Sequence, residues 1–123
     1  NGAKLGVLHG AAAYVCQNSE GQINNTESIS AGLDYPGVSP IHCFLKDTKR
    51  ARYTSATDEE ALKAYKLVTN IEKINPSLEP SHAFAEAIKI APKLSKDTII
   101  IVNSCGDAKK DRDILKARLG TNK

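Results

Sequence analysis

The chain has 123 residues, 41% hydrophobic and 25% charged, a composition that indicates one globular domain with a single core. Its net charge of +3 is small and the basic cluster at residues 46–52 has few aromatic neighbours, so we expect no nucleic-acid partner. The longest strongly apolar run, residues 99–102, is too short to cross a bilayer, which argues against a membrane protein. Three widely spaced cysteines favour a reducing compartment such as the cytoplasm.

The first part of the chain is predicted to hold strands, a loop and a short helix. Residues 5–17 are apolar with β-branched side chains, and the turn cluster 18–21 precedes Gln22-Ile23, which predicts a hairpin-like pair of strands. Residues 28–38 contain Gly32, Pro36 and Gly37 and follow neither a helical nor a strand period, so they are interpreted as a loop. A short helix is expected over residues 40–45.

A strand is predicted over residues 51–56, followed by a helix with a clear start signal. Thr57 and Glu60 have the spacing of a capping box, in which each side chain bonds to the other residue's backbone amide. Apolar residues then recur on one helical face, and Asn75-Pro76 ends the element. That predicted buried face consists of Ala61, Ala64, Tyr65, Val68 and Ile71.

A second helix is predicted to begin near Glu79, with Pro80 acceptable in its first turn, and to stop at Pro92. Its predicted buried stripe consists of Phe84, Ala87, Ile88 and Ala91. A final helix is expected over residues 108–119, with Asp107 as N-cap and Gly120 after its end.

Residues 98–102 form a β-branched run without alternation, which is typical of a strand buried on both faces of a parallel sheet. We therefore predict a three-layer α/β fold, with residues 1–123 forming a single domain, which the family resemblance described below implies to be partial. Ligands of such sheets bind beyond the carboxyl ends of the strands, so the turn at residues 103–107 is a candidate site. An ordinary strand-to-helix turn that binds nothing is the alternative.

Three blocks carry a family resemblance, namely residues 6–10, 28–38 and 78–83. In this order they resemble the C-terminal part of the tryptophan synthase β chain, a fold-type II enzyme that uses pyridoxal phosphate (PLP). The resemblance implies a parallel-sheet fragment of that enzyme's C-terminal domain. It also implies a lyase of tryptophan biosynthesis that joins L-serine to indole, with an α subunit partner and a β homodimer in the parent protein.

The chain starts at Asn1, and no segment of it resembles the family's Schiff-base lysine or glycine-rich phosphate cup. We therefore expect a piece of a longer chain that is inactive alone. Two alternatives remain at this point. One is a segment of another PLP-dependent lyase, and the other is a folded module that binds partners without catalysis.

The resemblance implies that cofactor contacts lie in the turn after the predicted central strand. Aligning the turn on the family pattern places Cys105 at the serine that meets the PLP pyridine nitrogen, with Gly106 after it; Ser104 takes the role if the turn shifts by one residue. Asp107 stands where the family has arginine, and a thiol is a weaker hydrogen-bond partner than a hydroxyl. Glu79 is implied to lie near the PLP ring as a catalytic carboxylate.

The resemblance also assigns a substrate side to the glycine-rich run and to the first strand. Asp34 is implied to be catalytic, changing partners on domain closure, and Leu8 and His9 to line the path of indole. The substrate-binding residues of the run are Ala31, Gly32, Leu33 and Asp34. The family further binds a monovalent cation through backbone carbonyls, which map to Leu33, Tyr35 and Gly37.

Overall fold

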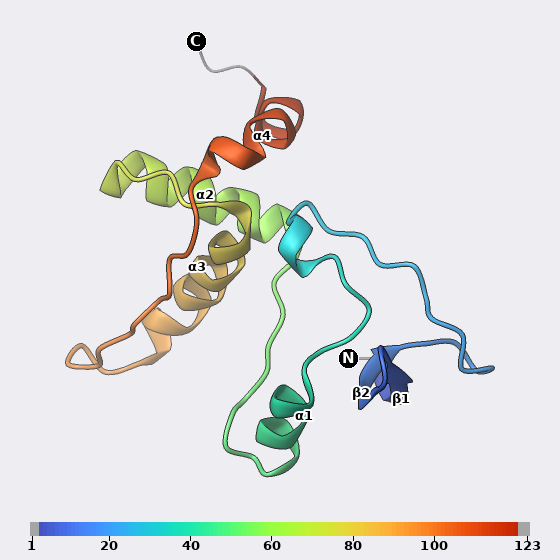
Figure 1. Ribbon diagram of the computed structural model, residues 1–123. Helices are drawn as coiled ribbons and strands as arrows, with labels where there is room; N and C mark the ends of the chain where they lie inside the picture. The colour runs from blue at the N-terminus through green and yellow to red at the C-terminus, as the bar shows by residue number, and fades with distance from the viewer. Residues whose placement is uncertain (1–2, 121–123) are drawn as a thin grey trace. The chain divides into compact units, whose positions relative to one another are not determined.

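A computed structural model describes residues 3–120, which form two compact units (Figure 1). The first unit contains residues 3–28 and 32–53, and the second contains residues 29–31 and 54–120. The described residues hold both helices and strands, with four α-helices and one two-stranded antiparallel sheet. The prediction of a mixed α/β chain is therefore confirmed at this level.

The first unit begins with a tight hairpin. Strand β1 (Ala3–Leu8) pairs antiparallel with β2 (Ala11–Cys16), with Leu8 opposite Ala11. His9 and Gly10 connect them with φ of 51° and 77°, the positive pair that suits a two-residue hairpin turn. The prediction of a single strand over residues 5–17 is wrong because this turn reverses the chain within it.

The predicted pairing across residues 18–21 is confirmed as a short extension of the same sheet. The Asn18 amide donates to the Gln22 carbonyl at 2.9 Å, and Gln17 forms an isolated antiparallel bridge with Ile23. The Asn18 side chain stabilises the turn by accepting from the Glu20 and Gln22 amides.

The glycine-rich run is a loop with one 3₁₀ turn, η1 (Ala31–Leu33), and leads to helix α1 (Pro40–Asp47). Ser39 caps α1, since its hydroxyl accepts from the Ile41 amide at 3.2 Å. The strand predicted over residues 51–56 is absent. No described strand or bridge pairs with those residues, and without a partner β-forming side chains do not make a strand.

The second unit starts its helical part with α2 (Asp58–Glu72), and the predicted capping box is present. The Thr57 hydroxyl accepts from the Glu60 amide at 3.3 Å, and the Thr57 amide donates to the Glu60 carboxylate at 2.8 Å. Ile71 is 63% exposed, so the predicted stripe ends one turn early. The helix buries Ala61, Ala64 and Val68.

Helix α3 (Leu78–Ile90) continues into the 3₁₀ turn η2 (Ala91–Lys93) and packs against α2. Its predicted buried stripe is wrong, since Ile88 is 42% exposed. Ser81 is fully buried. Its hydroxyl donates a hydrogen bond to the Ser77 carbonyl at 2.8 Å, and this bond compensates for burying a polar group on the packed face. The face that α3 buries consists of Leu78, Pro80, Ser81 and Ala85.

Residues 98–102 form no strand, so the predicted parallel sheet is not part of the described structure. Ile99 is 86% exposed and Ile101 is 91% exposed. A strand buried on both faces needs neighbouring strands and covering helices, and no described segment supplies them here.

The chain ends with the 3₁₀ turn η3 (Ala108–Asp111) and helix α4 (Arg112–Leu119). The predicted N-cap is confirmed, since Asp107 accepts from the Lys109 amide at 2.8 Å. The core of the second unit contains Ile29, Ala61 and Leu78, with Leu62 and Leu115 packed against them. None of the helices within residues 3–120 has both the length and the apolar character needed to cross a membrane.

Candidate functional site

The turn that carries the predicted cofactor contacts is anchored to the start of α3. The Ser77 hydroxyl donates to the Cys105 carbonyl at 2.9 Å. Gly106 follows with φ of 81°, and a Cβ added there would lie 2.8 Å from the Ser77 Oγ. Both the backbone conformation and the available space therefore favour glycine at this position.

Glu79 lies two residues after Ser77 and is held by a lysine from η3. Lys110 Nζ lies 2.7 Å from both carboxylate oxygens of Glu79 and 3.2 Å from Asp111 Oδ1. Asp111 is 3% exposed, and its Oδ2 accepts from the Leu78 amide at 2.8 Å. Two carboxylates and one ammonium thus connect the first turn of α3 to η3.

This arrangement changes the acid–base behaviour of the lysine. The hydrogen bond to Glu79 raises the pKa of Lys110 above its ordinary value, and the contact with Asp111 adds to the effect while burial opposes it. Lys110 therefore stays charged at neutral pH and keeps a fixed positive group on a Glu79 side chain that is 19% exposed.

Both candidates for the pyridine contact, Ser104 and Cys105, are exposed, and Cys105 is a free thiol. A thiol or a hydroxyl is a neutral partner for a ring nitrogen. Either side chain therefore suits the ring contact that the family resemblance implies, and that role stays a prediction. The structure brings three of the predicted residues, Glu79, Cys105 and Gly106, together around Ser77.

The first unit places several other predicted residues around one pocket of about 270 Å³. The ring of His9 stacks on that of Tyr35 with centroids 6.1 Å apart. A Cβ on Gly37 would lie 2.8 Å from Leu8 Cδ2, so glycine permits this close approach. Sequence reasoning missed Ala11 and Ala13 as lining residues, although their i, i+2 spacing on β2 places them on one face.

The remaining predicted substrate residues, Ala31, Gly32, Leu33 and Asp34, lie in and just after η1 and are all exposed. Asp34 makes no hydrogen bond or ion pair with another residue of the described part. Its carboxylate is consequently open to a new partner.

The backbone assigned to the cation is held by β2. Pro36 accepts a hydrogen bond from the Cys16 amide at 2.6 Å, and Gly37 forms a bridge with Val15. Within residues 3–120 no cluster of three or more His, Cys, Asp or Glu side chains could hold a metal ion. The assignment of Leu33, Tyr35 and Gly37 stays a prediction.

A partly buried network near the start of α3 was not predicted. His82 Nδ1 lies 2.9 Å from the Leu78 carbonyl and 3.2 Å from Ser30 Oγ, and His82 Nε2 lies 3.5 Å from Asp58 Oδ1. A carbonyl only accepts, so Nδ1 carries a proton. Ser30 is fully buried, so its hydroxyl is shielded from solvent within the second unit.

Comparison with known proteins agrees with the predicted family. No protein-family model matches the chain. The chain is 54% identical over 117 residues to a tryptophan synthase beta chain of Bordetella petrii, which covers 95% of this chain and 29% of the relative. Proteins of the same name from Cereibacter sphaeroides and Allorhizobium ampelinum are 53% and 56% identical, over 97% and 86% of this chain and 29% and 26% of the relatives. The chain is therefore homologous to the tryptophan synthase beta chain and spans less than a third of the length of these relatives.

Proposed function

We propose that this chain forms one side of the site of a PLP-dependent lyase that joins L-serine to indole, with loss of water, to make L-tryptophan. The homology to tryptophan synthase beta chains supports the family of the reaction. The observation that carries the proposal is the grouping of Glu79, its Lys110 partner and the Cys105-Gly106 turn around Ser77.

When bound, PLP withdraws electrons from the amino acid attached to it. In this proposal Cys105 faces the pyridine nitrogen as a neutral partner, which does not protonate it, and the Gly106 conformation fixes the direction of the turn. Ser104 is the alternative partner, one residue earlier on the same turn.

Glu79 is proposed as a proton acceptor. The ammonium of Lys110, 2.7 Å away, restricts the orientation of the carboxylate, while 19% of the Glu79 side chain stays exposed. A positioned carboxylate of this kind can take a proton from a substrate group that comes within hydrogen-bond distance of its oxygens.

The pocket of the first unit is proposed to receive the indole ring. Leu8 supplies an apolar wall, and the stacked rings of His9 and Tyr35 supply an aromatic one, which suits a flat, largely apolar substrate. The exposed Asp34 would change partners as the loop closes and excludes water, with Ala31, Gly32 and Leu33 beside the substrates.

Carbonyls in an irregular loop are suitable hard ligands, so we further propose that those of Leu33, Tyr35 and Gly37 contribute to a monovalent cation site. An α subunit, a β homodimer and a cytoplasmic location are proposed for the parent protein by family analogy. Alone, this chain should not catalyse the reaction.

The test is a chimera in which residues 1–123 replace the matching segment of the Bordetella petrii relative. We expect the chimera to form tryptophan from L-serine and indole and the isolated chain to form none. Glu79→Gln should lower kcat by roughly 100-fold or more. Glu59→Gln, in the first turn of α2 and outside the pocket of the first unit, is the matched control and should leave kcat unchanged. Equal losses in the two variants would refute the role of Glu79.

The ring contact is tested in the same chimera. Cys105→Ser should preserve or raise activity a few-fold, because the hydroxyl is the stronger hydrogen-bond partner. Cys105→Asp should change the cofactor absorbance spectrum, because a carboxylate beside the ring nitrogen favours its protonated form. If Ser104→Asp changes the spectrum and Cys105→Asp does not, Ser104 is the contact.

A further inference from the structure

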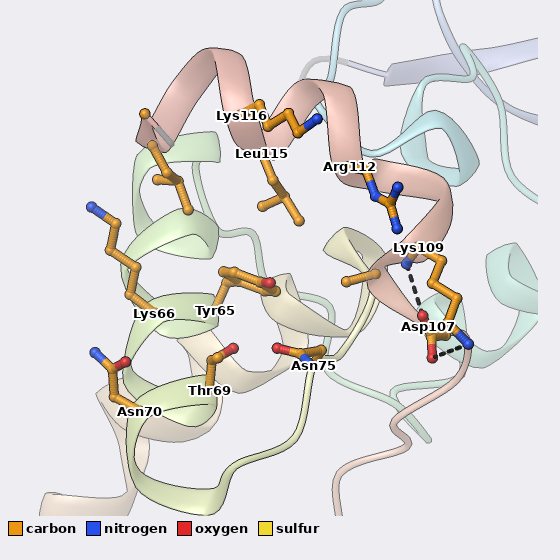
Figure 2. A pocket seen from close by; sticks show the side chains of 13 residues that line it. Tyr65, Lys66, Thr69, Asn70, Asn75, Asp107, Lys109, Arg112, Leu115 and Lys116 are labelled. Atoms are coloured by element: carbon orange, nitrogen blue, oxygen red, sulfur yellow. Dashed lines mark hydrogen bonds and ion pairs between the residues drawn. The ribbon is translucent and has the colours of Figure 1, made fainter. Parts of the chain in front are cut away.

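A second pocket, of about 560 Å³, lies in the second unit between α2 and the η3–α4 segment. Figure 2 shows the Tyr65 ring, the Asn75 carboxamide and the Leu115 side chain facing the space between these elements. The pocket contains none of the residues assigned above to cofactor or substrate.

The pocket is strongly cationic. Its wall carries one carboxylate, Asp107, and four basic side chains, those of Lys66, Lys109, Arg112 and Lys116. Asp107 is already used, since it accepts from the Lys109 amide as the N-cap of η3 and lies 3.9 Å from Lys109 Nζ.

The other three cations lack a counter-charge within the described part of the chain. Lys66, Arg112 and Lys116 make no ion pair with any residue between 3 and 120. Three like charges around one pocket repel one another, and a bound anion would relieve that repulsion. Because three charges are uncompensated, a dianion matches the pocket better than a monoanion does.

The remaining wall has a different character. Tyr65 offers an aromatic ring, and Leu115 and Leu119 offer apolar side chains. Asn70 and Asn75 add carboxamides that can donate to or accept from a ligand. Cationic groups beside an aromatic and apolar wall suit a ligand with a charged end and a flat apolar body.

We propose that this pocket binds a small phosphate monoester with an aromatic body. The phosphate lies against Arg112, Lys116 and Lys66, and the aromatic body lies against Tyr65 and Leu115. Arg112 is the main contact, because its planar guanidinium can form two parallel hydrogen bonds to a phosphate.

The probe is phenyl phosphate, titrated into the 123-residue chain while amide chemical shifts are followed by NMR. We expect saturable shifts confined to residues 65–75 and 107–120, with a Kd on the order of 1 mM or lower for an open, charge-lined pocket. Affinity should fall as salt is added, since screening weakens the attraction. Phenol, which lacks the charge, should bind at least about tenfold more weakly.

Matched variants locate the phosphate. Arg112→Gln should weaken binding about tenfold, the loss expected for a charge-assisted bidentate contact. Lys66→Gln should weaken it about threefold. Lys63→Gln is the control, because Lys63 is an exposed lysine on the same helix one turn earlier and does not line the pocket.

Three results would overturn the proposal. The first is equal weakening by Lys63→Gln and Lys66→Gln, which would mean a diffuse charge effect. The second is equal affinity for phenol and phenyl phosphate. The third is the absence of saturable shifts at residues 65–75 and 107–120. An undispersed amide spectrum, which would mean that the chain does not form the pocket, counts as this result.

Discussion

Lys110 Nζ lies 2.7 Å from both carboxylate oxygens of Glu79, although 31 residues separate the two in sequence. The same ammonium contacts Asp111 Oδ1, and Asp111 Oδ2 accepts a hydrogen bond from the Leu78 amide. One lysine thus serves both the proposed proton acceptor and the carboxylate that holds the start of α3.

Lys110→Gln should remove the part of the stability loss at alkaline pH that comes from deprotonation of Lys110 in this cluster. The folded-state pKa of Lys110 is raised, chiefly by Glu79, so its stabilising effect is complete below the unfolded-chain pKa and is lost as pH rises through the folded value. At neutral pH the loss should be at most about 1 kcal/mol, because half of the side chain is exposed. Urea unfolding, followed by circular dichroism from neutral to alkaline pH, measures the stability of the parent chain and of Lys110→Gln. Equal losses of stability in both proteins as pH rises would contradict the prediction.

Gly106→Ala should destabilise the second unit through two separate effects. A residue with a side chain pays about 1–2 kcal/mol for a left-handed conformation, and here the new Cβ also meets Ser77 Oγ at 2.8 Å. Gly10→Ala is the control, since Gly10 has φ of 77° but nothing within 4 Å of its Cβ position. Urea unfolding should give the larger loss for Gly106→Ala. A loss no greater than that of Gly10→Ala would mean that the Ser77 contact relaxes without cost.

Helix caps were predictable from the sequence, because the donor and the acceptor of each cap lie within one short segment. The capping box of Thr57 and Glu60 lies within four residues, as does the cap that Asp107 gives to η3. Long-range features were not predictable in this way. Residues 98–102 have strand-forming side chains, but a strand also needs a partner, and none of the described segments pairs with them.

The hairpin and the site show the same division. The turn at His9 was missed because a histidine with positive φ is uncommon and the flanking residues are continuously apolar. The position of Glu79 came from the resemblance, but its partner Lys110 did not, because only the packing of η3 on α3 brings them together. Likewise, α3 buries Ser81 in place of Ile88, since an internal hydrogen bond satisfies the serine.

Glu60→Gln should reduce the acid sensitivity of the chain. The pKa of Glu60 is lowered, first by its hydrogen bond from Lys89 and then by the Thr57 amide. A lowered pKa stabilises the fold above the unfolded-chain value, and that stabilisation is lost as pH falls through the folded value. The variant should therefore lose less stability than the parent between pH 6 and acid conditions, measured by urea unfolding. Glu59→Gln, its exposed neighbour, should keep the parent's acid profile, and equal flattening by both variants would count against the role of Glu60.

Thr69→Val should leave the stability of the second unit unchanged or raise it by up to about 1 kcal/mol. Thr69 Oγ1 is buried and has no hydrogen-bond partner within the described structure, so its desolvation is not compensated. Valine has nearly the same shape and removes the unsatisfied group. Thr69→Ser, which keeps the hydroxyl and loses the methyl group, should be less stable than the parent in the same urea titration. A fall in stability of about 1 kcal/mol or more on Thr69→Val would show that the hydroxyl has a partner in solution.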